Sequence, residues 1–258
     1  MGHGIHVDRD GHVATVTIEN AGKRNALDFE LIDDIVAAFQ GFEERDERTI
    51  AVLRGAGEQA FSAGFDLDID RSDQTEAEKA AWPGLLQTVE GYTYPVIGMI
   101  NGDCYGGAVG LAAACDVRIG VDDARFGVTP ARVGLVYGGE AINRLMSLIG
   151  PAKAKEMLFT ANAIPATHAA EIGLLNYAVP RADLEDRTYD MAQTMAGNAP
   201  YSLEKMKEVI DAITAKGSLS GAEKEWVQTL RDRAFASDDH AEGRAAFAEG
   251  REPEFTGE

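Results

Sequence analysis

Two short turns of small residues are candidate places where the backbone itself could do chemistry. Residues 60–66, AFSAGFD, follow one predicted strand, and residues 101–110, NGDCYGGAVG, follow another and contain four glycines. Glycine permits tight turns and lets a ligand approach main-chain N–H groups with no side chain in the way. Both turns could therefore present backbone donors to an anion.

Gly107 stands at the predicted start of the helix AVGLAAAC. Unpaired N–H groups and the helix dipole favour negative charge at such a position. If the N–H of Phe65 came within about 3 Å of the same point, the two donors would form an oxyanion hole, in which one donor contributes about 3–4 kcal/mol to a transition state. The same residues are also compatible with two turns that only connect elements.

Other site chemistries fit the sequence poorly. Residues 66–73, DLDIDRSD, lack the glycine and the glutamate of a calcium loop, and the glycines of 102–110 do not have dinucleotide-binding spacing. There is no phosphate-binding loop and no nucleophile elbow. The two cysteines, Cys104 and Cys115, are predicted to be buried and reduced. His3 and His6 lie in a terminus that is predicted to be mobile, and His168 and His240 lie in helical segments with no assignable partner. No metal site is predicted.

Alternating strands and helices must position the two turns. Residues 12–20 alternate in polarity as a strand does, and residues 27–44 place apolar side chains at three- and four-residue steps, as an amphipathic helix does. Apolar strands are predicted at 49–55 and 94–102, each running into one of the turns. This order predicts the α/β class, with a sheet covered by helices.

The C-terminal part of the chain changes character. Strand signals stop after residues 174–180, and consecutive helical patterns follow, with 198–200 and Gly217 at their joints. We predict a core of residues 1–197 and a helical region of residues 198–258. The helical region would act as a closing lid or as an oligomerisation arm.

Charge and hydropathy restrict the partners. The 258-residue chain carries 24 Lys and Arg against 43 Asp and Glu, for a net charge of −19, so no nucleic-acid partner is expected. This acidity is typical of a well-solvated surface and also fits adaptation to high salt. No apolar run is long enough to span a membrane and the N-terminus lacks a signal core, so we expect a cytoplasmic protein.

Six blocks occur in order along nearly the whole chain, at residues 22–35, 60–68, 99–120, 124–138, 149–179 and 235–255. Together they resemble the crotonase (enoyl-CoA hydratase/isomerase) superfamily. The resemblance implies a ββα spiral core with a C-terminal helical trimerisation region, in a homotrimer or a dimer of trimers. It also implies an acyl-CoA thioester substrate, with coenzyme A entering as part of that substrate and no separate cofactor.

The same resemblance implies roles for particular residues. The main-chain N–H groups of Phe65 and Gly107, the pair already identified by position, would hold an enolate oxygen. The remaining implied contacts are to coenzyme A, through the loop after the first turn and through cations at its phosphates: Ala63, Asp66, Leu67, Lys23, Arg24 and Arg251.

Two departures from the family pattern bear on the reaction. The hydratases of this family have two glutamates where this chain has Gly110 and Pro130. Adding water to an enoyl thioester needs a base for the water and an acid for the α-carbon, so ordinary hydration is not expected. Decarboxylation of a 2-carboxyacyl thioester needs neither, because loss of CO2 generates the enolate directly.

Residues 126–139, FGVTPARVGLVYGG, are similar to a loop of the family's methylmalonyl-CoA decarboxylases that ends in a tyrosine. Tyr137 matches that tyrosine and would orient the leaving carboxylate or donate a hydrogen bond, although it could equally pack the loop. The resemblance is partial, because those enzymes keep a glutamate where Gly110 stands and a histidine where Phe65 stands.

Two alternatives remain. Glu140, at a predicted helix start, could be the base of an enoyl-CoA isomerase or could simply complement the helix dipole. A weakly catalytic acyl-CoA-binding protein also fits the loss of both glutamates. In either case residues 70–92 are predicted to include a mobile segment that covers the acyl pocket, with Trp82, Leu85 and Leu86 as candidate walls, although these residues also fit ordinary helix packing.

Overall fold

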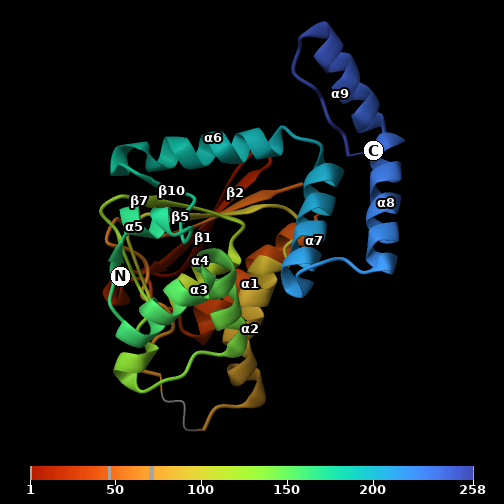
Figure 1. Cartoon of the computed structure of the whole chain (residues 1–258). Coiled ribbons are helices and arrows are strands. Elements are labelled where there is room, and N and C mark those ends of the chain that lie inside the picture. Colours follow the sequence, from red (N-terminus) through yellow and green to blue (C-terminus); the bar gives the residue numbers. More distant parts are fainter. Residues whose placement is uncertain (1, 46–47, 70–72, 258) are drawn as a thin grey trace.

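The computed structural model describes residues 2–45, 48–69 and 73–257 (Figure 1). Its larger sheet has the strand order β1-β2-β3-β5-β7-β10, with β1 and β2 antiparallel and the other pairs parallel. The strands of this sheet are β1 (His3–Asp10), β2 (Val13–Asn20), β3 (Ile50–Gly55), β5 (Val96–Ile100), β7 (Val117–Val121) and β10 (Tyr177–Val179). Long buried runs such as VIGMI in β5 place this sheet in the core.

A second, smaller sheet has the order β4-β6-β8-β9. Its strands are β4 (Ala60–Ser62), β6 (Asp103–Tyr105), β8 (Arg125–Gly127) and β9 (Ile164–Pro165). The chain alternates between the sheets, because β3 is followed by β4, β5 by β6 and β7 by β8, and a helix follows each pair. The α/β class and the ββα spiral predicted from the sequence are confirmed.

The helices of the body cover these sheets. They are α1 (Phe29–Glu43), α2 (Glu76–Glu90), α3 (Gly107–Ala114), α4 (Gly139–Thr160), α5 (Ala166–Glu171) and α6 (Leu184–Ala196), with short 3-10 turns η1 (Ala21–Lys23), η2 (Pro130–Val133) and η3 (Arg181–Asp183). Helix α3 is packed against both α2 and α4, which explains why its sequence is apolar on nearly all sides. It is the central helix of the site described below.

The predicted helix at 27–44 begins two residues later than the pattern suggested. Asp28 is its N-cap, and its carboxylate accepts a hydrogen bond from the N–H of Leu31 at 3.0 Å. Leu27 therefore lies outside the helix, where it forms a bridge with Phe65. The apolar positions Leu31, Ile35 and Phe39 are buried as predicted.

The N-terminus is not a mobile segment, which corrects the interpretation of its polar sequence. Strand β1 pairs with β2 over its full length. As an edge strand with one partner it stays largely exposed, so its sequence carries little apolar alternation. The histidines of this strand contact carboxylates: His3 Nε2 lies 2.7 Å from Asp28 Oδ2 and His6 Nε2 lies 2.6 Å from Glu19 Oε2.

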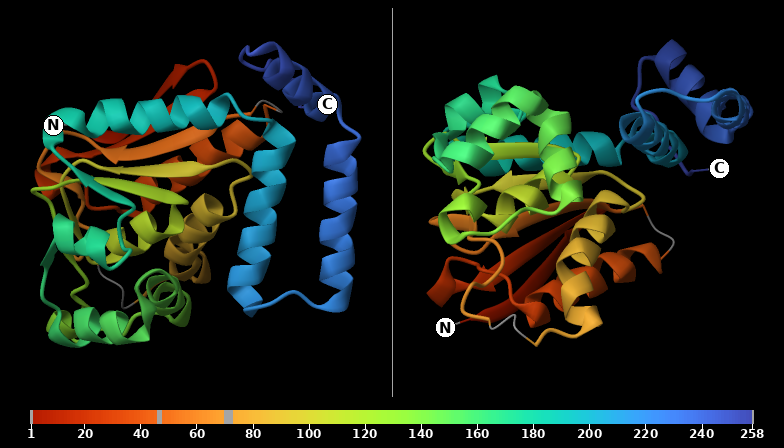
Figure 2. Two further views of the ribbon diagram at one scale, coloured as in Figure 1. Left: turned by 45° about the horizontal axis from the view of Figure 1, so that its top comes forward. Right: turned by 60° about the horizontal axis from the view of Figure 1, so that its bottom comes forward.

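The remaining helices form an arm at the C-terminal end, α7 (Pro200–Lys216), α8 (Gly221–Phe235) and α9 (Asp238–Glu249). Helix α6 still contacts the large sheet, whereas α8 and α9 stand clear of it (Figures 1 and 2). None of the described residues of α8 is buried. Large apolar side chains are exposed along the arm: Met206, Ile210, Ile213, Phe235 and Phe247. The arm starts close to the predicted boundary, and its role in oligomerisation stays a prediction.

Two further expectations concern the described residues. Cys104 and Cys115 are free and buried, as predicted, and burial raises the pKa of the Cys115 thiol to about 12. No helix in the described ranges is long and apolar enough to cross a membrane.

Candidate active site

The two glycine-containing turns touch each other. Gly64 has a φ of +85°, and a Cβ atom at this position would lie 2.5 Å from the nitrogen of Gly107 and 3.0 Å from the nitrogen of Ala108. Both the backbone conformation and the lack of space therefore require glycine. This contact brings the two predicted donor segments together.

The backbone of Phe65 is held by its bridge to Leu27. The N–H of Leu27 donates to the carbonyl of Gly64 at 2.8 Å, and the N–H of Asp66 donates to the carbonyl of Leu27 at 2.8 Å. In extended backbone, successive peptide groups point to opposite sides. The N–H of Phe65 therefore points away from Leu27, and Phe65 lines the same cavity as Gly107.

Gly107 is the first residue of α3, and Gly106 is its N-cap with φ 57° and ψ −128°. The N–H of a first helical residue has no acceptor within its own helix. A Cβ atom at Gly107 would lie 2.5 Å from Cζ2 of Trp82, so the edge of the indole covers this glycine. The geometry thus places two main-chain segments and one aromatic wall around a common space.

That space is a cavity of about 370 Å³ between α2, α3 and the segment after β8. Its walls are mostly apolar or glycine, and the titratable side chains among its described lining residues are Glu78, Lys79 and Tyr137. The lining also includes Ala63, Leu67, Trp82, Pro83, Gly110, Thr129, Pro130, Val133, Leu135, Val136, Gly138 and Ala141. Within the described residues, no group of three or more His, Cys, Asp or Glu could hold a metal ion.

The two positions at which the sequence lacks glutamates both line this cavity. Gly110 lies one turn after Gly107 on α3, and Pro130 begins η2 on the opposite wall. The lining carboxylate of Glu78 belongs to a capping box instead. Its Oε2 accepts hydrogen bonds from the N–H of Thr75 at 2.7 Å and from its hydroxyl at 2.8 Å, which lower the pKa of Glu78. Glu78 is thus an ionised helix cap at the cavity wall.

Tyr137 lines the cavity, and its hydroxyl is a buried polar group. This hydroxyl has no hydrogen-bond partner among the residues that the structure describes. Burial raises its pKa well above the ordinary value, and the nearby Cys104 adds to this shift. The hydroxyl is therefore a neutral donor, and a buried donor without an acceptor costs about 1–3 kcal/mol.

Glu140 lies in the first turn of α4, where its side chain is exposed. Its neighbours Gly138 and Ala141 line the cavity, whereas Glu140 is not part of the lining. This placement is typical of an acidic residue that complements a helix dipole. The structure does not bring the proposed isomerase base into the cavity.

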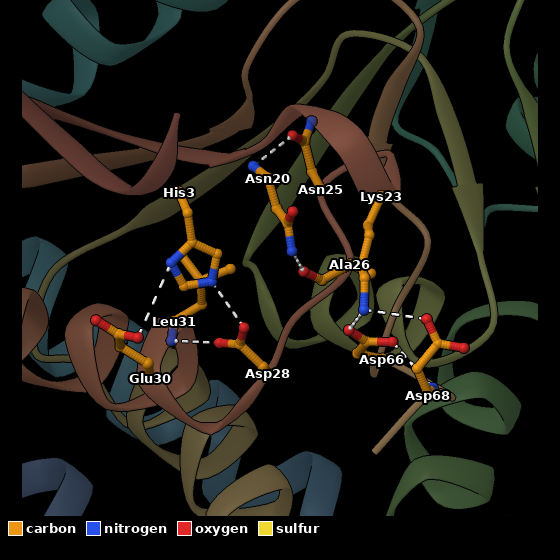
Figure 3. Close-up of polar contacts among 10 residues, drawn as sticks. All are labelled: His3, Asn20, Lys23, Asn25, Ala26, Asp28, Glu30, Leu31, Asp66 and Asp68. Atoms are coloured by element: carbon orange, nitrogen blue, oxygen red, sulfur yellow. Dashed lines mark hydrogen bonds and ion pairs between the residues drawn. The ribbon is translucent and has the colours of Figure 1, made fainter. Parts of the chain in front are cut away.

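Lys23 and Asp66 form an ion pair that anchors the first turn (Figure 3). Lys23 Nζ lies 2.5 Å from Asp66 Oδ2 and 3.1 Å from Asp68 Oδ2. Burial of Asp66 raises its pKa, but the bonds from Lys23 and from the N–H of Asp68 outweigh burial, so the net shift is downward. Lys23 therefore holds the loop of Ala63, Asp66 and Leu67, and a phosphate contact through its exposed part stays a prediction.

A buried asparagine network, which the sequence analysis missed, ties the same turn to the body (Figure 3). Asn25 has a φ of 56°, its side-chain oxygen accepts from the N–H of Asn20 at 3.1 Å, and its amide nitrogen donates to the carbonyl of Ala60 at 2.9 Å. The hydroxyl of Ser62 donates to the carbonyl of Asn25 at 2.6 Å. The local signal was an asparagine, a residue that tolerates left-handed backbone, directly after two cations.

The other predicted cations lie elsewhere. Arg24 is exposed, and its carbonyl accepts from the N–H of Ala63 at 3.0 Å. Arg251 follows α9 on the arm, where its two terminal nitrogens bond to the carboxylate of Glu242 at 2.5 and 2.9 Å. Figure 1 shows α9 far from α2 and α3, so within one chain Arg251 is not brought to the cavity.

Comparison with known proteins gives a consistent result. The family model described as enoyl-CoA hydratase/isomerase matches residues 8–258. The methylmalonyl-CoA decarboxylase of Escherichia coli K12 is 30% identical over 255 residues, covering 98% of each chain. The carnitinyl-CoA dehydratase of Citrobacter koseri is 30% identical over 267 residues, covering 100% of each. The crystal structure of an enoyl-CoA hydratase from Bacillus anthracis, 30% identical, superimposes with a TM-score of 0.90 over 98% of this chain and 99% of the other.

Proposed function

This chain belongs to the enoyl-CoA hydratase/isomerase family, and from that premise we propose that it decarboxylates a 2-carboxyacyl-CoA thioester. One observation carries the proposal. The cavity lined by Phe65 and Gly107 has Gly110 and Pro130 where acid–base catalysis would need carboxylates. The methylmalonyl-CoA decarboxylase among its relatives supports this choice.

The reaction follows from where the charge moves. The bond between the α-carbon and the carboxylate breaks, and its electron pair becomes the C=C bond of the enolate while CO2 leaves. Negative charge builds on the thioester oxygen, which accepts hydrogen bonds from the N–H groups of Phe65 and Gly107. A proton from solvent then adds to the α-carbon and regenerates the thioester carbonyl.

The walls of the cavity favour this direction of charge movement. Among the described lining residues the one cation is Lys79, whose Nζ is paired with Glu76 Oε1 at 2.7 Å, and the rest of the lining is mostly apolar or glycine. A carboxylate in such surroundings loses hydration, whereas the charge that develops on the thioester oxygen is met by fixed backbone dipoles. When substrate binds, Tyr137, which lines the cavity, would turn its buried hydroxyl toward the substrate and donate a hydrogen bond that orients the carboxylate.

A comparison of substrates tests this proposal. We expect methylmalonyl-CoA or ethylmalonyl-CoA to release CO2 with saturation kinetics, and crotonyl-CoA to be hydrated at least about 100-fold more slowly, because one missing acid–base group removes about that factor. Faster turnover of crotonyl-CoA would refute decarboxylation. Turnover of a 3-enoyl-CoA that is lost in Glu140→Gln would establish the isomerase instead, and saturable binding without turnover would establish a binding protein.

Replacing Tyr137 with phenylalanine should separate activity from stability. We expect kcat for decarboxylation to fall about 10- to 100-fold, because a hydrogen bond to a charged group contributes about 1.5–3 kcal/mol. The free energy of unfolding should stay equal or rise by about 1 kcal/mol, because the substitution removes a buried donor without an acceptor. Steady-state kinetics and denaturant unfolding measure the two effects. Tyr177→Phe, on an exposed strand position, is the control and should change neither.

The pH dependence should show that Tyr137 acts in its neutral form. Its raised pKa means that the hydroxyl keeps its proton beyond the ordinary tyrosine value of about 10. We therefore expect kcat for decarboxylation to stay level between about pH 8 and pH 10. A decrease in wild-type kcat with an apparent pKa below about 9, absent in Tyr137→Phe, would show that the hydroxyl ionises early and would contradict this assignment.

The arm of α7–α9 supports a further part of the proposal, a homotrimer or a dimer of trimers. Its exposed side chains Met206, Ile210 and Phe247 would be buried between copies. Within its own chain Arg251 does not reach the cavity, but in such an assembly it would lie near the cavity of a neighbouring chain.

A further inference from the structure

Trp82 lies directly against the residue that would hold the thioester oxygen. A Cβ atom at Gly107 would lie 2.5 Å from Cζ2, 3.0 Å from Cη2 and 3.1 Å from Cε2 of the indole. All three atoms belong to the six-membered ring, so this ring covers Gly107 edge-on. Any group attached next to a carbonyl held at Gly107 must therefore pass the indole.

The wall continues one helical turn further along. Trp82 and Leu86 are four residues apart on α2, and Gly107 and Gly110 are three apart on α3, so each pair lies on one helix face. A Cβ atom at Gly110 would lie 3.8 Å from Cδ1 of Leu86, which is an ordinary contact. Leu86 is itself buried in the core, so on this face of α2 the packed core begins one turn beyond Trp82.

The indole is held in place by an aromatic series. The rings of Phe65 and Trp82 meet edge to face with centroids 5.9 Å apart, and Phe29 meets Phe65 in the same way at 5.4 Å. Pro83, next to Trp82, also lines the cavity and restricts the local backbone. Moving the indole aside would therefore break its contact with Phe65, a ring that is itself packed against Phe29.

The two ends of an acyl-CoA would use opposite sides of this site. The loop at Ala63 and Leu67 opens to solvent, where Leu67 is 68% exposed, and it leads away from Gly107 toward the outside. The remaining cavity lining, which includes Trp82, Gly110 and Tyr137, would then surround the acyl group. The length of the acyl group would thus be limited by these lining residues.

We propose that Trp82 sets the upper limit of acyl-chain length and restricts the site to short-chain acyl groups. This inference rests on the proposed acyl-CoA site but not on the decarboxylation step. It assigns to Trp82 a specificity-determining contact with the acyl group and leaves the chemistry to the backbone donors and Tyr137.

Binding of saturated acyl-CoAs tests the inference without any reaction. We would measure Kd for butyryl-CoA and octanoyl-CoA by calorimetry with the full-length wild type, Trp82→Ala and Trp82→Leu. We expect the wild type to bind butyryl-CoA at least about tenfold more tightly than octanoyl-CoA. Trp82→Ala should shift that ratio toward octanoyl-CoA by at least about tenfold, because each methylene that becomes buried raises affinity about fourfold. Trp82→Leu should give an intermediate ratio.

Trp226→Ala is the matched control, since it removes an indole from α8 on the arm and leaves the cavity intact. We expect it to keep the wild-type ratio, and circular dichroism with thermal unfolding would establish that each variant is folded. Equal wild-type affinity for both thioesters, or an unchanged ratio in folded Trp82→Ala and Trp82→Leu, would overturn the inference. A shifted ratio in a protein that releases no CO2 from any 2-carboxyacyl-CoA would uphold it and refute the proposed reaction alone.

Discussion

Replacing Gly107 with proline should lower kcat for decarboxylation by about 100- to 1,000-fold relative to Gly107→Ala. Both variants add a Cβ atom, which would lie 2.5 Å from Cζ2 of Trp82, so both must displace the indole. Only proline also removes the N–H of residue 107. The ratio of the two variants therefore cancels the shared effect of the Cβ atom and reports the loss of the donor together with the ring carbon that replaces it beside Gly64.

The proline variant should fold, because the first position of a helix is the one at which proline is best tolerated. Gly107 occupies this position in α3, and its N–H makes no helical bond there. Thermal unfolding of both variants would verify that their stability is similar. If Gly107→Pro and Gly107→Ala turn over substrate within about threefold of each other, the N–H of Gly107 does not stabilise the transition state and the oxyanion assignment fails.

Much of the candidate site could be predicted because the residues proposed for it were recognised from their backbone positions. A glycine at a strand end or helix start can be read directly from the sequence, and the structure places Gly64 against Gly107 and puts Phe65 on the same cavity. The strand β2 and the helix α1 were predictable from the spacing of their apolar residues, and β3 and β5 from short continuous apolar runs.

Features that depend on long-range packing could not be predicted. The short strands β4 and β6 were interpreted as turns, because three residues are too few to show a period. The Tyr137 hydroxyl has no hydrogen-bond partner among the described residues. That depends on which residues pack around it from distant parts of the chain, so the local sequence does not show it. For Glu140 the sequence left two interpretations open, a base in the cavity or a complement to the helix dipole, and its exposed position in the first turn of α4 fits the second.

Gly110 is the residue at which the sequence and the cavity together are most informative. It lies inside α3, where glycine is less favourable than alanine by about 0.5–1 kcal/mol. A Cβ atom there would meet only Leu86 within 4 Å, at an ordinary 3.8 Å. Steric crowding therefore does not require a glycine at this position. The effect of having glycine here is that space is left open in the cavity.

Replacing Gly110 with glutamate should accordingly change the reaction. The new carboxylate would stand beside the substrate carboxylate, and two like charges at close range in a cavity of low polarity repel strongly. We expect decarboxylation to fall at least about tenfold below that of Gly110→Gln, which has the same shape without the charge. Hydration of crotonyl-CoA should rise at least about tenfold above that of Gly110→Gln, because one positioned acid–base group contributes about 100-fold or more.

The glutamine variant makes this comparison specific to charge. Both side chains fill the same space next to Leu86 and Trp82, so any loss that arises from filling the cavity appears equally in both. Parallel assays of CO2 release and of crotonyl-CoA hydration give the two rates for each variant. If the glutamate and glutamine variants behave alike in both assays, a carboxylate at position 110 does not reach the reacting atoms, and the glycine there does not decide between decarboxylation and hydration.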